Sequence, residues 1–228
     1  MTLNQIKVAV YSLYLTNYYG FKLSGVTDSL KRKEARIGYA NKILNRLNIK
    51  VEIINKERIP KDGQYLLASN HRTIIDPLIV EIATQDSDIH GNWIAKKELY
   101  NSFFFGKFTR NLGTILLDRE ASQMGGFFKD IKECVKEGNS IYIFPEGTRN
   151  KTDSAIAEFK EGAQIIAMKN RLPILPVYIR SKANDVLKEA IKDSSEQRII
   201  EIEIGNIIDY KDRTLPFEQA YKKQFNIS

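Results

Sequence analysis

The sequence has little cysteine, little histidine and no long hydrophobic run. These shortages exclude, in turn, an intrachain disulfide, a zinc site and a bilayer-spanning helix. Its single cysteine, Cys134, cannot form a disulfide within the chain, and the helical spacing around it predicts a packed thiol rather than a nucleophile. The two histidines, His71 and His90, give no ligand spacing for zinc. The longest uncharged stretch near the start, residues 8–21, is too short and too polar for a bilayer-spanning helix, which needs ~20 mostly apolar residues. Because no secretory signal is recognisable, we expect a reducing, cytoplasmic location.

Acidic residues are scarce in one part of the chain only. The whole chain has 35 basic and 28 acidic residues, a net charge of +7. Residues 1–50 hold nine basic and two acidic residues and so carry this net charge alone, whereas residues 51–228 hold 26 of each sign. A basic segment attached to a neutral body is typical of proteins that bind an anionic membrane or nucleic acid.

The basic segment has the periodicity of two helices, over residues 3–19 and 28–48. The first has apolar residues and tyrosines on one face, and the second has an apolar stripe with basic residues on its other faces. The residues of these faces are Ile6, Val10, Tyr11, Leu13, Tyr14 and Tyr18 in the first helix, and Lys31, Arg32, Lys33, Arg36, Lys42 and Arg46 in the second. This pattern suits helices that lie in a membrane interface. The segment alone also allows a hairpin that only packs on the body with a solvated basic face, or a nucleic-acid-binding element.

The rest of the chain alternates β-rich runs with segments of helical period. The runs are residues 51–54, 65–69, 92–95, 114–118, 140–144, 174–179 and 198–205, and the helical segments are 77–84, 124–138 and 159–170. This alternation predicts an α/β fold with a mostly parallel sheet flanked by helices. We expect one domain over residues 51–228, preceded by the two-helix segment 1–50.

His71 begins a turn that combines a potential base with a carboxylate. The pair Asp76-Pro77 predicts a helix start, with Asp76 as the N-cap and Pro77 as the first helical residue. A turn before that helix can bring the Asp76 carboxylate to Nδ1 of His71, which leaves Nε2 free to accept a proton. The spacing alone leaves open that Asp76 only caps the helix and that His71 is a surface residue. His90 lies in a polar turn and is interpreted as structural or solvated.

Two further polar turns follow β-rich runs, and each contains an arginine. Arg119 follows Asp118, and Arg149 ends the Phe-Pro-Glu-Gly-Thr-Arg sequence at residues 144–149. A guanidinium beside a loop of backbone N–H groups can hold a phosphate, and Gly147 permits close backbone approach. Taken singly, each arginine could equally be a surface ion-pair partner. Because ligands bind outside the carboxyl ends of strands in open α/β sheets, we expect the three polar turns to meet in one crevice.

Four sequence blocks occur in a fixed order, at residues 70–76, 113–119, 144–149 and 172–177. Together they resemble the glycerolipid acyltransferase family, which includes the bacterial 1-acyl-glycerol-3-phosphate acyltransferases. Thr73 stands where the family often has serine, and Leu172 replaces the more usual valine or isoleucine. The matched span is roughly half of the chain. The family's α/β fold and its membrane-binding N-terminal helices agree with the patterns described above.

The resemblance implies transfer of an acyl group from acyl-coenzyme A or acyl-carrier protein to the sn-2 hydroxyl of 1-acyl-glycerol 3-phosphate, giving phosphatidic acid. Glycerol 3-phosphate or another lysophospholipid are alternative acceptors. It implies that His71 removes the hydroxyl proton and that Asp76 orients the imidazole. The acceptor-binding residues that it implies are Lys96, Arg119, Glu146, Gly147, Thr148 and Arg149. It implies no metal or organic cofactor, and a peripheral location on the cytoplasmic face of an anionic membrane. A nucleic-acid-binding protein is disfavoured because residues 51–228 have no excess of basic residues.

Overall fold

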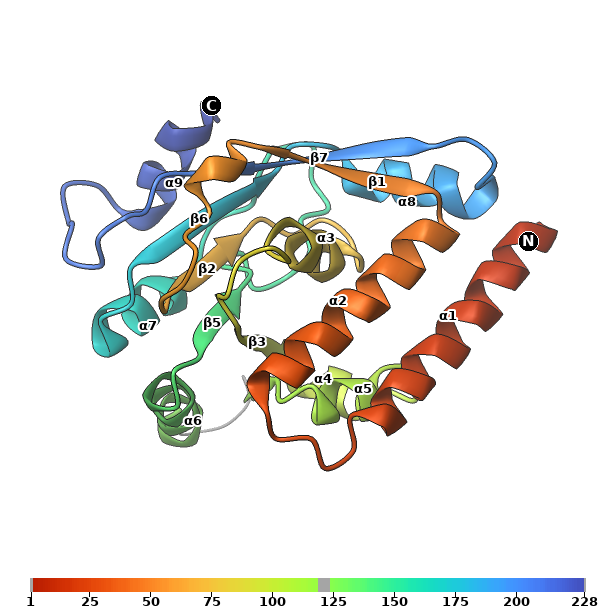
Figure 1. The fold of residues 1–228 in the computed structure, drawn as a ribbon. Coiled ribbons are helices and arrows are strands. Elements are labelled where there is room, and N and C mark those ends of the chain that lie inside the picture. The colour runs from red at the N-terminus through yellow and green to blue at the C-terminus, as the bar shows by residue number, and fades with distance from the viewer. Residues whose placement is uncertain (1, 119–123, 228) are drawn as a thin grey trace.

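The computed structural model describes residues 2–118 and 124–227 (Figure 1). Within them, seven strands form one sheet in the order β1-β7-β6-β2-β5-β3-β4. The strands are β1 Ile49–Ile54, β2 Leu66–Ser69, β3 Gly91–Lys96, β4 Ile115–Leu117, β5 Ser140–Ile143, β6 Ile174–Ile179 and β7 Arg198–Ile204. Neighbouring strands are parallel except β6 and β7, which are antiparallel. The predicted mostly parallel α/β fold is confirmed, and each of the seven β-rich runs overlaps one strand. β1 begins two residues before its run, and β3 extends one residue beyond its run at each end.

Five of the helices were predicted from the sequence. The helices are α1 Leu3–Lys22, α2 Ser29–Arg46, α3 Asp76–Ala83, α4 Lys97–Tyr100, α5 Gly106–Asn111, α6 Gly125–Lys136, α7 Gly162–Asn170, α8 Ala183–Lys192 and α9 Phe217–Phe225, with a 3₁₀ turn at Lys56–Arg58. The sequence analysis predicted α1, α2, α3, α6 and α7. It did not predict α4, α5, α8 or α9. These are short and mostly polar: α9, for example, buries only Phe217, Tyr221 and Phe225. In α4 and α5 too few apolar positions repeat to reveal a helical period. In α8 the apolar residues Val186, Leu187, Ala190 and Ile191 do follow a helical period, which the sequence analysis missed.

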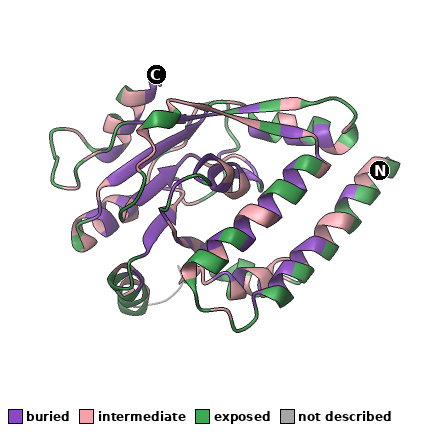
Figure 2. Ribbon diagram, viewed as in Figure 1, coloured by how far each residue is buried: buried purple, intermediate pink, exposed green. Residues whose placement is uncertain are grey.

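Helices cover both faces of the sheet, which explains why its central strands are apolar on both sides. In β2, Leu67 belongs to the core cluster shared with α2, α3 and α8, whereas Leu66 and Ala68 belong to the cluster shared with α6, α7 and α9. Figure 2 shows that burial is concentrated in these central strands and on one side of the outer helices. Cys134 of α6 lies in the second cluster, where burial raises its pKa to about 12, so the packed thiol is confirmed.

The two N-terminal helices share the first core cluster with the sheet. Ala40 and Leu44 of α2 are buried, and α1 lies alongside, with Leu15 and Tyr19 buried (Figure 1). Two of the basic residues that the sequence placed outside the apolar stripe of α2, Lys33 and Arg36, are not solvated. They are buried because they bind groups of the body: the guanidinium of Arg36 pairs with Glu81, and Lys33 donates to the carbonyl of Ser87.

The outer face of α1 exposes a stripe of large apolar and aromatic side chains. Leu3, Ile6, Val10, Tyr14, Tyr18 and Phe21 are each exposed, from 45% for Tyr18 to 67% for Leu3. Their spacing of three or four residues places them along one side of the helix, opposite the buried side. Among the described residues, no helix combines the length and the hydropathy that crossing a bilayer requires.

Candidate active site

Parallel pairing brings the carboxyl ends of four strands to one edge of the sheet. β2, β5, β3 and β4 are successive neighbours, so the turns that follow them leave the sheet on the same side. The turn with His71 follows β2, and the turn at residues 144–149 follows its neighbour β5. Lys96 is the last residue of β3, one strand further along. Arg119, which follows β4, lies outside the described residues.

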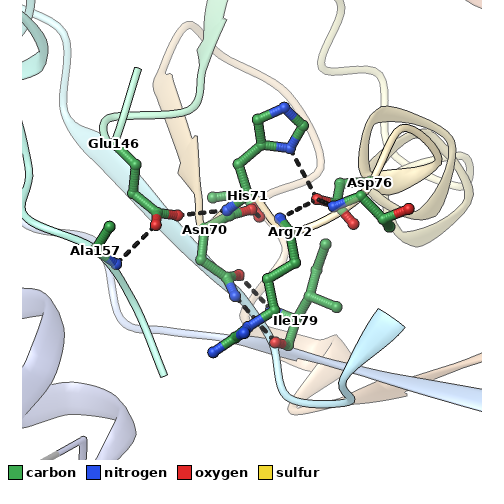
Figure 3. A network of polar contacts seen from close by, with 9 residues as sticks. Asn70, His71, Arg72, Asp76, Glu146, Ala157 and Ile179 are labelled. Carbon is green, nitrogen blue, oxygen red and sulfur yellow. Dashed lines mark hydrogen bonds and ion pairs between the residues drawn. The ribbon is translucent and has the colours of Figure 1, made fainter. Parts of the chain in front are cut away.

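The predicted His71–Asp76 pair is formed. Nδ1 of His71 lies 2.8 Å from Oδ2 of Asp76. The Asp76 side chain is fully buried, whereas that of His71 is 19% exposed. The same oxygen of Asp76 accepts hydrogen bonds from the backbone N–H groups of Arg72, at 2.6 Å, and Thr73, at 2.8 Å. In Figure 3 the other ring nitrogen of His71 points away from this network. The pair thus offers an oriented imidazole with one nitrogen available to a substrate.

The helix start at this pair differs from the prediction by one residue. α3 begins at Asp76 itself, Ile75 occupies the cap position, and Pro77 is the second helical residue. The Asp76 side chain does not cap the helix, because its Oδ2 turns back to the preceding residues and binds the two N–H groups and the imidazole there. Its negative charge still lies in the first helical turn, where the helix dipole favours it.

The backbone of His71 is held from both sides by the turn that follows β5. Its N–H donates to Oε1 of Glu146 at 2.5 Å, and its carbonyl accepts from the N–H of Asn150 at 2.6 Å. The other Glu146 oxygen accepts from the N–H of Ala157 at 2.7 Å (Figure 3). Glu146 is only 2% exposed, and this burial raises its pKa to about 7. In this structure Glu146 therefore supports the histidine turn, and its contact with an acceptor stays a prediction.

Asn70 is a site residue to which the sequence analysis gave no role. Its Nδ2 donates to the carbonyl of Ile179 at 3.1 Å, and its Oδ1 accepts from the N–H of the same residue at 2.8 Å. This pair of bonds fixes the start of the histidine turn to the end of β6. The available sequence signal was an asparagine directly after a fully buried strand, a place where a polar side chain needs a partner.

Of the remaining predicted acceptor-binding residues, three lie in the turn that follows β5 and Lys96 lies at the end of β3. Gly147 adopts a φ of 67°, and its N–H closes the turn on the carbonyl of Phe144 at 2.9 Å. Thr148 and Arg149 follow it and are exposed, and Lys96 is half-buried at the end of β3. Phosphate binding by these residues stays a prediction.

Comparison with known proteins places the chain in a family. A family model described as Acyltransferase matches residues 50–180. A 1-acyl-sn-glycerol-3-phosphate acyltransferase of Helicobacter pylori is 38% identical over 129 residues, 55% of this chain and 53% of that protein. One of Bacillus subtilis is 30% identical over 161 residues, 71% of this chain and 77% of that protein. The match thus spans about half the length of the first relative.

The fold has a counterpart among solved structures. The crystal structure of the 1-acyl-sn-glycerophosphate (LPA) acyltransferase PlsC from Thermotoga maritima superimposes with a TM-score of 0.69 and covers 98% of this chain and 90% of that chain. At 24% identity this likeness supports the fold alone. The family match covers more than half of the chain. It includes the His71–Asp76 pair and the turn whose residues bind the backbone of His71. The chain therefore belongs to the acyltransferase family.

Proposed function

We propose that this protein transfers a fatty acyl group from an acyl thioester to the sn-2 hydroxyl of 1-acyl-glycerol 3-phosphate, giving phosphatidic acid. The observation that carries the proposal is the contact of 2.8 Å between His71 and the buried carboxylate of Asp76. It is supported by the relatives in Helicobacter and Bacillus, which are named for this activity.

In the proposed reaction, Nε2 of His71 takes the proton of the acceptor hydroxyl as its oxygen attacks the thioester carbonyl. The new C–O bond gives a tetrahedral intermediate, which collapses as the C–S bond breaks. The thiol leaves with the proton that His71 carried. The negative charge of Asp76 holds Nδ1–H in place and stabilises the imidazolium while it exists. No acyl-enzyme is formed.

Recognition of the acceptor phosphate is assigned to the basic residues Lys96, Arg119 and Arg149, of which Lys96 and Arg149 lie at the carboxyl edge of the sheet. The exposed guanidinium of Arg149 follows Gly147 and Thr148 in the turn that clamps His71, so a phosphate bound there would lie near the base. Glu146 and Gly147 shape this turn. The acyl donor, acyl-coenzyme A or acyl-carrier protein, is part of the proposal and is left to the assay below.

The protein is proposed to act as a peripheral protein on the cytoplasmic face of an anionic membrane. The support is the exposed apolar stripe of α1, together with five exposed lysines in residues 1–50. These are Lys7, Lys22, Lys31, Lys42 and Lys50. An apolar helix face bordered by basic residues binds the interface of an anionic bilayer. An acceptor with an acyl chain resides in that interface, so the site would meet it there.

The direct test is an acyl-transfer assay with the full chain on mixed vesicles. Three acceptors, 1-acyl-glycerol 3-phosphate, glycerol 3-phosphate and a lysophospholipid with a larger headgroup, are each crossed with acyl-coenzyme A and acyl-carrier protein. The proposal predicts the highest kcat/KM with 1-acyl-glycerol 3-phosphate. Higher kcat/KM with either of the other acceptors, or no transfer to any of them, would overturn it.

A further inference from the structure

The face of the His71 ring is covered by an aromatic side chain that the proposed chemistry does not use. The rings of His71 and Phe144 are stacked, with centroids 4.0 Å apart and planes inclined by 12°. Phe144 also stacks with Trp93, at 4.9 Å and 24°. Three nearly parallel rings, from the turns after β2 and β5 and from strand β3, are therefore in contact at the carboxyl edge of the sheet.

Trp93 is itself fixed by buried polar and aromatic contacts. Its Nε1–H donates to Oε1 of Glu81 at 2.8 Å, and the same oxygen lies 2.5 Å from Nε of Arg36. Its ring is nearly perpendicular to that of Tyr142, with centroids 5.3 Å apart. Each of these residues is less than 8% exposed. A buried indole whose N–H binds a carboxylate has little freedom to turn, so Trp93 offers Phe144 a rigid surface.

Asp76 alone does not fix the plane of the imidazole. A single hydrogen bond restrains the position of Nδ1 but permits rotation of the ring about the line from Nδ1 to Oδ2 of Asp76, through combined changes in χ1 and χ2. Such a rotation changes the direction in which the Nε2 lone pair points. A flat ring parallel to the imidazole and in contact with its face removes that rotation. The direction of Nε2 is then set by two contacts, Asp76 at the edge and Phe144 on the face.

We propose that Phe144, supported by Trp93, is a positioning residue for His71. The inference rests on the proposed function in one respect, that His71 is the base. It differs from it in assigning the direction of Nε2 to a side chain that takes no part in the proton transfer. Proton transfer needs the base within hydrogen-bond reach and correctly directed, so a loose ring affects the chemical step more than binding.

Two kinds of substitution separate the flat ring from its bulk. Phe144→Leu and Phe144→Met keep an apolar side chain but remove the plane, and each is expected to lower kcat by about 10- to 100-fold while KM for the acceptor stays within about threefold. Phe144→Tyr keeps the plane and is expected to stay within about threefold of the wild-type kcat. Phe128→Leu is the matched control. Phe128 is a partly buried residue of α6 that packs against the second core cluster, and its ring centroid lies 5.4 Å from that of Phe127. Loss of this ring should leave kcat unchanged.

Nuclear magnetic resonance of the full chain with labelled histidine supplies a readout independent of activity. With two histidines in the sequence, His90→Ala assigns the remaining signal to His71. Loss of the Phe144 ring should move the His71 ring protons downfield, because a stacked aromatic ring shields them, whereas Phe128→Leu should leave them in place.

Two results would overturn the inference. Unmoved His71 signals in both Phe144→Leu and Phe144→Met would mean that the stack is absent in solution. Moved signals with wild-type kcat in both variants would mean that the stack does not position the base. Failure of the proposed function is distinguishable, because wild-type protein would then show no transfer to lysophosphatidate while the stacking signals could still be measured.

Discussion

Single residues hold the base through neighbours that are distant in sequence. Asp76 binds the His71 ring, whereas Glu146 and Asn150 bind its backbone from a turn about 75 residues further along the chain. Three fixed points on one residue leave little room for His71 to shift as a whole. Removing the imidazole should therefore affect chemistry without disturbing the turn.

Replacement of His71 by alanine should lower kcat by at least ~10²–10⁴, the usual effect of losing a general base. The backbone bonds to Glu146 and Asn150 do not need the imidazole, so folding should survive. Acyl-transfer kinetics with circular dichroism as a folding check measures both. His90→Ala is the control, because Nδ1 of His90 lies 2.9 Å from the carbonyl of Asp88, away from the site. Wild-type turnover in folded His71→Ala would contradict the assignment of the base.

The raised pKa of Glu146 predicts that the stability of the protein depends on pH. Burial raises its pKa from 4.5 to about 7, so between these pH values the folded protein holds a proton that the unfolded chain releases. The free energy of unfolding should therefore fall as pH rises through this window, by on the order of 3 kcal/mol in total. Urea unfolding at pH 5 and pH 8 should show this fall in the wild type and a smaller one in Glu146→Gln, which cannot titrate. An identical pH dependence in both proteins would rule out a raised pKa.

Among the elements, α2 is bound to the body by a buried ion pair. Arg36 and Glu81 are both less than 5% exposed, and the pair joins α2 to α3. Arg36→Ala leaves the carboxylate of Glu81 buried without its cation and should lower the free energy of unfolding by ~3–5 kcal/mol. Lys31→Ala, on the exposed side of the same helix, should change it by less than about 0.5 kcal/mol. Denaturant unfolding of both variants measures these changes. If both variants lowered the free energy of unfolding equally, the buried ion pair would have no special role in binding α2 to the body.

The apolar stripe of α1 makes a prediction about membrane contact. Val10 is 63% exposed within the stripe, and the neighbouring Ala9 is exposed about 100° away around the helix. Val10→Glu should weaken binding to anionic vesicles by about tenfold or more, because it removes apolar burial of ~1.5–3 kcal/mol. Ala9→Glu adds the same charge outside the stripe and should have a much smaller effect. Co-sedimentation would contradict the stripe's role if both variants bound equally well.

At the scale of the whole molecule, the uneven charge predicts the lipid and salt dependence of binding. The net charge of residues 1–50 equals that of the entire chain, and five of the lysines there are exposed. The full chain should bind anionic vesicles more tightly than neutral ones. High salt should reduce binding to anionic vesicles to the neutral-vesicle level without abolishing it, because salt screens charges and leaves the apolar contribution. Vesicle titrations at low and high salt test this prediction. Equal affinity for anionic and neutral vesicles at low salt, or complete loss of binding at high salt, would refute it.

The sequence alone determined the features that depend on local pattern. Alternating β-rich and helical segments predicted the seven strands and five of the helices, because burial of one helix face or of a whole strand leaves a pattern of apolar residues in the sequence. The His71–Asp76 pair was one of the arrangements that the spacing of five positions allowed, and the resemblance to the acyltransferase family favoured it. Counting charges located the basic segment.

The tertiary structure decided which polar residues are exposed to solvent and which are buried against distant partners. Lys33 and Arg36 look like their exposed neighbours in the sequence, but the fold brings Ser87 and Glu81 to them and buries them. Glu146 binds a residue 75 positions away, and Asn70 one 109 positions away. Such partners leave no periodic trace, because the desolvation and pairing of a polar group depend on which distant segment packs against it. Only the order of the strands, with β2 between β5 and β6, sets these partners and so the surroundings of His71.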